Sequence, residues 1–578
     1  MRIPILALLG MTLTLSSVPA LAQPQPGAPA QPPPLGPPLP PPLPPPAAPD
    51  TGAQPAGAAQ VAPPEAPPPP PMPGTIEVAP PPPPPTPVFQ ATGDAAPVLD
   101  RQPLAGWHGG FFLRDPNDYF RLYPKGRVHL DFHSFFGSGV SDVKAVDGGN
   151  ALQPRFFVRR ARLAVAGEFL KRWSFEFEAE FAGQALNNPN GRAETSASAP
   201  GQNPTAETAR FAGVQTASAG TTLTDAWINY SVMPAVNFIF GQYLAPFSLE
   251  NASSDNATSL MDRSIATRAF AFPNLRDIGA MMWGEIADRT LVYGIGVFGG
   301  DGQNRPGVDS KPDFIGRVFA RPLAGDKKGL LAKAQIGVSA QHGERDQEYV
   351  GYDYPAIRTG QGYTLWEPGY RDSARRRVHI IPSGSQNAIG GELRLPIKRV
   401  DLRGELYYVA NDTREAVEGY QLTNTERLGE LRGISWYGQL SVWLGDAFVS
   451  GDPGFSPRPT KMDLSKEVDK PMKGLELVAL IGGINATYDG AAREGTYDPA
   501  TPGAPEGPGS DIKIMQIGFG ANYWHTRYVR ATVSYSMYST PGSGSADNLA
   551  VVPGNLLREP DLDAHAIHEL GARLAVSF

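Results

Sequence analysis

Three arginines in one short segment are the first candidates for chemistry in this sequence. Arg159, Arg160 and Arg162 stand in a stretch where apolar residues, Leu163 and Val165, occupy alternate positions. Arginine stays charged, and its planar fork of N–H donors matches the oxygens of phosphate. On a regular strand Arg160 and Arg162 share one face, whereas Arg159 points outward unless a β-bulge turns it inward. The spacing predicts a site for small anions on the inner face of a sheet.

A competing interpretation comes from the next alternating segment. Glu176, Glu178 and Glu180 share one face of a predicted strand, and Phe175 and Phe177 share the other. Adjacent strands bring such residues opposite one another, where opposite charges pair. The arginines then pair with these glutamates near the membrane interface, and both interpretations remain open at this point.

Alternation with period two is the dominant pattern from residue 127 onward, and it is typical of β-strands. Gaps after even-numbered strands are short and gaps after odd-numbered ones are long, with 446–472 as the exception. Short turns at one end and long loops at the other are typical of a transmembrane barrel, which must close because lipid cannot satisfy an open edge. The predicted fold class is all-β, a transmembrane antiparallel β-barrel of about sixteen strands. The predicted strands are 127–137, 155–168, 172–183, 222–233, 235–243, 277–287, 289–299, 312–322, 331–341, 387–396, 400–410, 432–445, 473–488, 511–524, 526–539 and 566–578.

Composition divides the 578 residues into four parts and excludes several functions. Residues 1–22 read as a signal peptide, and 23–100, which hold 32 of the 62 prolines, as a disordered periplasmic linker. Residues 101–126 form a lead-in to a barrel domain over 127–578. Cysteine is absent, which excludes disulfides and thiolate sites, and the net charge of −7 gives no reason to expect a nucleic-acid partner.

Several segments resemble the phosphate-selective porin O and P family. The most specific is the string GQYLAPFSLE over 241–250, with looser matches at 159–167, 225–230 and 261–264. The resemblance implies an outer-membrane channel of Gram-negative bacteria, typically a homotrimer, that passes anions such as phosphate through a basic, constricted lumen. It implies contact with membrane lipid, no cofactor and no enzymatic activity. Phe578 resembles the C-terminal signal that the barrel-assembly machinery recognises.

By analogy with porins, the gap 244–276 is predicted to fold into the lumen as the constriction loop; the alternative is an external lid. Its arginines complete the predicted pore lining, and its acids balance them. The arginines are Arg263, Arg268 and Arg276, and the acids are Glu250, Asp255 and Asp262.

Metal sites and catalysis are weakly indicated. His129, Asp131 and His133 share one strand face, but a metal needs further ligands. The turn at 301–304 has oxygen ligands of the type calcium uses, without the remaining acidic positions. None of the eight histidines sits in a recognisable Ser-His-Asp arrangement.

Charge leaves the selectivity open. Residues 101–578 carry 49 basic and 52 acidic side chains, so any anion preference depends on local charge at a narrow point. The main function predicted is anion diffusion. The alternative is a general, carbohydrate-preferring or cation-preferring porin of the same fold. A further alternative function is adhesion, with the proline-rich tract as the working part.

Overall fold

The structure, a computed structural model, describes most of the predicted barrel, all within the compact unit Ala95–Phe578. The predicted signal peptide and proline-rich linker lie outside the described residues. Those residues are 104–136, 154–182, 221–256, 258–270, 276–304, 310–326, 329–345, 357–360, 364–366, 369–371, 377–417, 428–445, 459–464, 473–490, 509–539 and 566–578.

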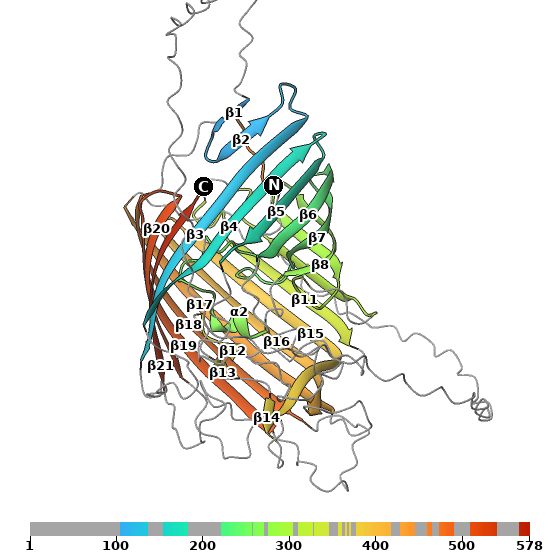
Figure 1. Ribbon diagram of the computed structural model, residues 1–578, viewed down its shortest axis with the longest axis vertical. Coiled ribbons are helices and arrows are strands. Elements are labelled where there is room, and N and C mark those ends of the chain that lie inside the picture. Colours follow the sequence, from blue (N-terminus) through green and yellow to red (C-terminus); the bar gives the residue numbers. More distant parts are fainter. Residues whose placement is uncertain are drawn as a thin grey trace, which may run out of the picture. The chain divides into compact units, whose positions relative to one another are not determined.

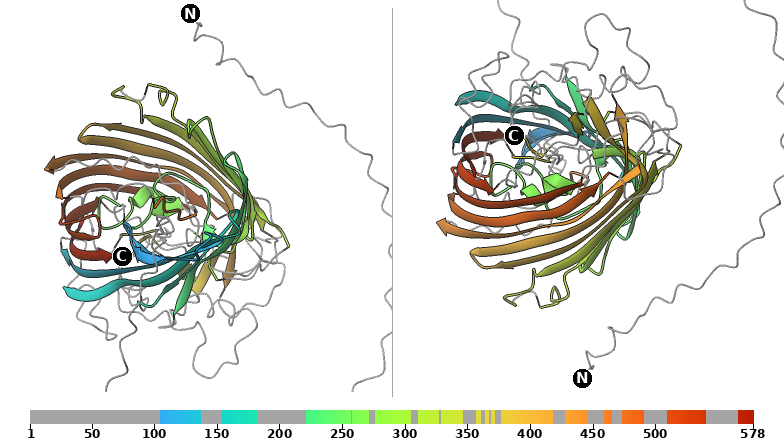
Figure 2. Two further views of the ribbon diagram at one scale, coloured as in Figure 1. Left: turned by 90° about the horizontal axis from the view of Figure 1, so that it is seen from above. Right: turned by 90° about the horizontal axis from the view of Figure 1, so that it is seen from below.

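Sixteen antiparallel strands form a closed barrel, as predicted (Figures 1 and 2). Each strand pairs with its neighbours in sequence, and the last pairs with the first over Arg127–Phe136. The strands are β3 (Phe120–Phe136), β4 (Arg155–Phe169), β5 (Trp173–Glu180), β6 (Thr222–Met233), β7 (Val236–Leu244), β8 (Arg276–Ile286), β9 (Leu291–Phe298), β10 (Asp313–Ala320), β11 (Gln335–Arg345), β15 (Arg377–Ile397), β16 (Val400–Val417), β17 (Leu428–Gly445), β18 (Gly474–Asp489), β19 (Gly509–Trp524), β20 (Val529–Ser539) and β21 (Ile567–Ser577).

The two faces of the wall differ as the alternation requires. On β3, Val128 and Leu130 are 38% and 47% exposed, whereas His129 and Asp131 between them are buried at 0% and 1%. On this strand, apolar side chains therefore face outward and polar ones inward. This is the reverse of a soluble protein and is suited to lipid outside and water within.

The smaller elements cap or line the barrel. The hairpin of β1 (Ala105–Trp107) and β2 (Phe111–Arg114) continues the sheet beside β3. The lead-in is shorter than predicted, because β3 already begins at Phe120. The other elements are β12 (Ile357–Arg358), β13 (Thr364–Trp366), β14 (Gly369–Arg371) and the helix α2 (Ile265–Phe270). No helix among the described residues is long and apolar enough to cross a membrane.

The seam between the two ends of the barrel involves the terminal residue. Gly126 and Phe578 exchange two backbone hydrogen bonds of 2.9 Å, and the Phe578 ring lies over the glycine. Phe578 thus completes the pairing of β21 with β3.

Gly241 is the glycine that the wall requires most strictly. Its φ is +125°, and a Cβ there would lie 2.1 Å from the backbone oxygen of Ala226 on β6. We predict that Gly241→Ala lowers the unfolding temperature of the barrel, because the strained backbone costs about 1–3 kcal/mol before the clash is added. Heat-dependent mobility on gels measures this. Gly391→Ala on β15 is the control, since nothing lies within 4 Å of its added Cβ; equal losses in both variants would contradict the prediction.

Candidate functional site

The segment between β7 and β8 folds into the barrel rather than over it. We call residues 245–270 the inner loop, of which 257 is not described. Its helix α2 packs against β16, β17 and β18, and Figure 2 shows α2 inside the ring of strands. Ile265 N donates to Gln516 Oε1 at 2.7 Å, and Ser435 Oγ donates to the carbonyl of Ala266 at 3.1 Å. The prediction that this loop enters the lumen is confirmed.

A buried glutamate on the wall holds the start of the inner loop. The Glu405 carboxylate on β16 accepts hydrogen bonds from the backbone N–H of Leu249 at 2.6 Å and of Glu250 at 2.8 Å. Tyr437 OH donates to the same carboxylate at 2.7 Å. Glu250 in turn accepts from Ser264 Oγ at 2.6 Å, which ties the two ends of the loop together. The loop is therefore a fixed obstruction in the lumen.

Asp255 of the inner loop is the centre of an arginine cluster. Its carboxylate lies 3.0 Å from Arg160, 3.3 Å from Arg162 and 2.8 Å from Arg263. Burial alone would raise the pKa of Asp255. The guanidinium groups of Arg160, Arg263 and Arg162 outweigh burial and hold that pKa well below its usual value. Asp255 is therefore ionised at neutral pH.

The cluster extends along β5, β6 and β8. Arg162 also contacts Glu178 at 3.1 Å and Glu180 at 2.6 Å. Arg276 lies 2.8 Å from Asp225 and 4.0 Å from Glu178. The pairing with glutamates that the competing interpretation expected is thus found for Arg162, which contacts two of the three. The third, Glu176, pairs with Lys125 instead.

A β-bulge turns Arg159 inward. Arg160 lies opposite His129, and Val158 lies opposite Leu130, so Arg159 is the extra residue between them. Its guanidinium lies 3.4 Å from Asp262 of the inner loop. Arg268, in α2, interacts electrostatically with the same carboxylate. The structure therefore brings all six predicted arginines into one network through the carboxylates of Asp255, Asp262, Asp225 and Glu178.

Arginines slightly outnumber carboxylates in this network. Two further arginines join it, Arg127 through Glu178 and Arg573 through Asp131. Together with the six predicted ones they make eight, against Asp131, Glu178, Glu180, Asp225, Asp255, Asp262 and Glu569. The local excess is one positive charge.

Three enclosed nitrogens in the cluster lack a hydrogen-bond partner among the described residues. They are Arg159 Nε, Arg160 Nη1 and His129 Nδ1, and His129 is the direct cross-strand neighbour of Arg160. Buried polar groups are almost always satisfied, so the two arginine nitrogens mark a place for water or a small anion. His129 Nε2 donates to Asn256 Oδ1, so Nδ1 is an acceptor and suits water alone.

Substituting Asp255 tests whether it restrains the arginines. We predict that Asp255→Asn strengthens anion preference and lowers the unfolding temperature at pH 7, because three guanidinium groups lose their common partner. A depressed carboxylate pKa stabilises the fold fully above the unfolded value near 3.9. The stability difference from the parent protein should be constant from pH 7 to about pH 4 and shrink only below it. A difference that already vanishes by pH 6 would contradict this role.

A second segment in the lumen escaped sequence analysis. Residues 459–464, from the long gap after β17, lie against the inner wall of β3 and β4. Arg121 donates to the carbonyl of Met462 at 2.9 Å, and Lys125 donates to Thr460 Oγ1 at 3.2 Å. Met462 and Leu464 pack on Phe112 and Tyr123. The gap that broke the alternation of lengths therefore also contributes described residues to the interior of the barrel.

Arg403 and Arg530 were also missed, because nothing in their local sequence distinguishes them. Arg403 donates to Ser259 Oγ at 3.0 Å, and Arg530 donates to the carbonyl of Thr258 at 2.6 Å. Arg403 on β16 therefore reaches the inner loop from the far wall, and Arg530 on β20 reaches it from the side of the cluster, beside Arg573 and Asp131.

The weaker metal candidates have other roles. Asp131 makes a two-pronged ion pair with Arg573, with both N–O distances 2.7 Å. Within the turn at 301–304, Asn304 N donates to Gln242 Oε1, and its side chain donates to the carbonyl of Leu223. Across the described part of the chain, no group of three or more His, Cys, Asp or Glu side chains is arranged to hold a metal.

Comparison with known proteins agrees with this geometry. Residues 127–311 match the model of the family phosphate-selective porin O and P. The match covers the first seven barrel strands, including the bulge, the inner loop and all six predicted arginines. The resemblance predicted from the sequence is confirmed over this stretch, and the barrel is an outer-membrane porin. No curated protein matches the chain.

Among solved structures, the chain is similar to several porins at low identity. OmpT of Vibrio cholerae is 9% identical, with a TM-score of 0.40, over 80% of this chain and 98% of its own. An anion-selective porin from Comamonas acidovorans is 11% identical, with a TM-score of 0.40, over 79% and 100%. The channel DcaP of Acinetobacter baumannii is 12% identical, with a TM-score of 0.38, over 79% and 97%.

Proposed function

We propose that this porin lets small anions, phosphate among them, diffuse passively across the outer membrane. The observation that carries the proposal is the arginine cluster around Asp255, where the inner loop narrows the lumen. An excess of one positive charge is small, but low-dielectric walls strengthen its field at a constriction. The unpartnered nitrogens of Arg159 and Arg160 offer an anion its hydrogen bonds at that point.

Arginines that pair with carboxylates suit transport better than unpaired arginines would. An ion must leave a pore as readily as it enters, so weak and repeated binding is favoured over one tight site. Asp255 and Glu178 reduce the attraction of the guanidinium groups for a passing anion. The pore then conducts instead of trapping its solute.

The decisive measurement is the reversal potential of the purified protein in a planar bilayer under a KCl gradient. Anion selectivity requires chloride to carry most of the current, and phosphate added at millimolar concentration should reduce the chloride conductance. A potential showing that potassium carries the current would overturn the proposal.

A general, carbohydrate-preferring or cation-preferring porin is the second candidate. The near balance of charge over residues 101–578 favours it. Equal permeability to potassium and chloride, together with uptake of neutral sugars into proteoliposomes, is the result that distinguishes it.

Association and assembly form a separate part of the proposal. We infer that three copies associate in the membrane and that the barrel-assembly machinery recognises the strand ending in Phe578. Mass measurement in mild detergent tests the first inference. Replacement of Phe578 by a polar residue, with the yield of folded barrel measured in cells, tests the second.

A further inference from the structure

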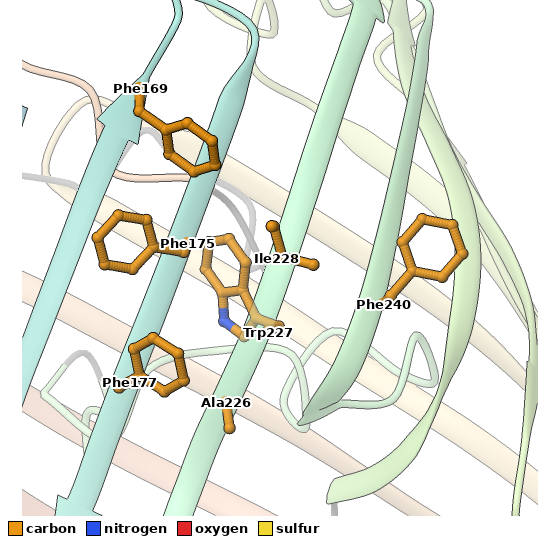
Figure 3. Close-up of a pocket in the computed structure, with 7 residues that line it drawn as sticks. All are labelled: Phe169, Phe175, Phe177, Ala226, Trp227, Ile228 and Phe240. Carbon is orange, nitrogen blue, oxygen red and sulfur yellow. The ribbon is translucent and has the colours of Figure 1, made fainter. Parts of the chain in front are cut away.

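An aromatic groove crosses the outer face of β5, β6 and β7. Its volume is about 440 Å³ (Figure 3). Phe177 and Phe240, on its two sides, are 55% and 49% exposed, so the groove opens outward to lipid and not into the lumen. Its lining residues are Phe169, Phe175, Phe177, Ala226, Trp227, Ile228 and Phe240.

The groove exists because two small residues, Ala226 and Gly241, lie next to each other on neighbouring strands of the wall. Ala226 lies directly across from Phe177 on the neighbouring strand, and its methyl group leaves space that a larger outward side chain would fill (Figure 3). Beside it, Gly241 has no side chain, and its Cα lies too close to the Ala226 carbonyl for any Cβ. The lining is almost wholly apolar, which suits a hydrocarbon chain.

The groove lies in the half of the membrane next to the short turns. Phe177 is four residues beyond Trp173, the first residue of β5, which is roughly 13 Å along the strand at about 3.3 Å per residue. Strand tilt shortens this depth further, so the groove stays within the nearer half of a hydrocarbon core about 30 Å thick. Short turns of such barrels face the periplasm, and the periplasmic leaflet consists of glycerophospholipids.

Two basic residues stand at the periplasmic end of the groove. Lys171 and Arg172 belong to the exposed turn 170–172 between β4 and β5, which follows Phe169 of the groove lining. No carboxylate among the described residues lies within ion-pairing distance of either side chain. Phe169 stacks on Trp173 at 5.9 Å, and Trp173 contacts Tyr230 at 4.7 Å, which forms the aromatic girdle expected at the interface.

We propose that the groove binds an anionic glycerophospholipid of the periplasmic leaflet. One acyl chain lies along Phe175, Phe177 and Ala226, and the phosphate group meets Lys171 and Arg172. The groove matches such a lipid in both charge and depth. Its apolar lining lies at the depth of the acyl chains, its aromatic rings lie at the interface, and the two cations lie at the depth of the phosphates. This inference rests on the outer-membrane location and is independent of anion selectivity in the pore.

The experiment reconstitutes the full chain in nanodiscs that hold equal amounts of phosphatidylglycerol and phosphatidylethanolamine, followed by native mass spectrometry. The parent protein should retain one phosphatidylglycerol per barrel. Lys171→Gln with Arg172→Gln should reduce the preference for phosphatidylglycerol roughly tenfold or more, since each cation near a lipid phosphate contributes about one decade or slightly less. Ala226→Trp should reduce the retention of both lipids by filling the groove.

Matched controls lie on the opposite wall. Lys398 and Arg399 repeat the same exposed pair in the turn between β15 and β16, and Leu406 is an outward residue of β16 with 54% exposure. Lys398→Gln with Arg399→Gln, and Leu406→Trp, should leave lipid retention unchanged.

Equal retention in the parent, the Lys171/Arg172 variant and Ala226→Trp would overturn the proposal. So would a second copy in the groove, seen as an oligomer that Ala226→Trp dissociates while lipid retention stays constant. Conductance does not enter the measurement, so failure here leaves the proposed function untouched.

Discussion

Replacing Arg159 and Arg160 with glutamine should change the sign of the reversal potential under a KCl gradient. The cluster holds an excess of one positive charge, and removing two guanidinium groups leaves an excess of one negative charge beside the inner loop. At an effective dielectric constant near 20, each unit charge about 6 Å away alters an ion's energy by roughly 3 kcal/mol before screening. A change of at least about tenfold in the ratio of chloride to potassium permeability follows.

A charge control separates this local effect from net charge. Arg432 is exposed on β17 and forms its ion pair with Glu430, and neither residue belongs to the cluster around Asp255. Arg432→Gln should leave the reversal potential where it is. If the double variant remains anion-selective, with normal folding and yield, then the cluster does not set the selectivity and another part of the channel does.

Replacing Glu405 with alanine should loosen the inner loop and raise the conductance. The substitution leaves the buried N–H groups of Leu249 and Glu250 and the Tyr437 hydroxyl without an acceptor. Each unsatisfied buried group costs about 1–3 kcal/mol, so the loop loses several kcal/mol of anchoring. We expect a larger and noisier single-channel current, together with new protease cleavage inside residues 245–270.

Tyr437→Phe is the matched variant for this experiment. It removes only the hydrogen bond from Tyr437 of β17 to Glu405 and keeps both bonds that the carboxylate accepts from the inner loop. Its conductance should stay close to that of the parent. Identical currents in Glu405→Ala and the parent would mean that the packing of α2 alone holds the loop.

Strand placement could be predicted because lipid imposes a simple rule on each residue. Where a strand crosses the membrane, alternate residues meet hydrocarbon, and all sixteen predicted strands were found. The rule fails where strands extend beyond the membrane. β15 begins at Arg377 rather than at 387, since 377–386 has no alternation and includes a bulge between Pro382 and Gln386.

The arginines of the site could be found from sequence, but their partners could not. Arg159, Arg160 and Arg162 stand out because charge is rare within an alternating strand. Their pairing with Asp255 and Asp262 spans about a hundred residues and depends on how deeply the inner loop enters the lumen. The contribution of residues 459–464 depends likewise on contacts with a wall more than three hundred residues away in sequence.

The seam between β3 and β21 has a consequence for how the chain reaches its final form. The ring joins strands that lie at opposite ends of the barrel sequence, and the last contact is made by Phe578 with Gly126. A polypeptide that stopped before β21 would leave the edges of β3 and β20 without partners in a medium that offers them none. Insertion therefore cannot proceed strand by strand during synthesis. The chain must be kept unfolded until β21 has been translocated.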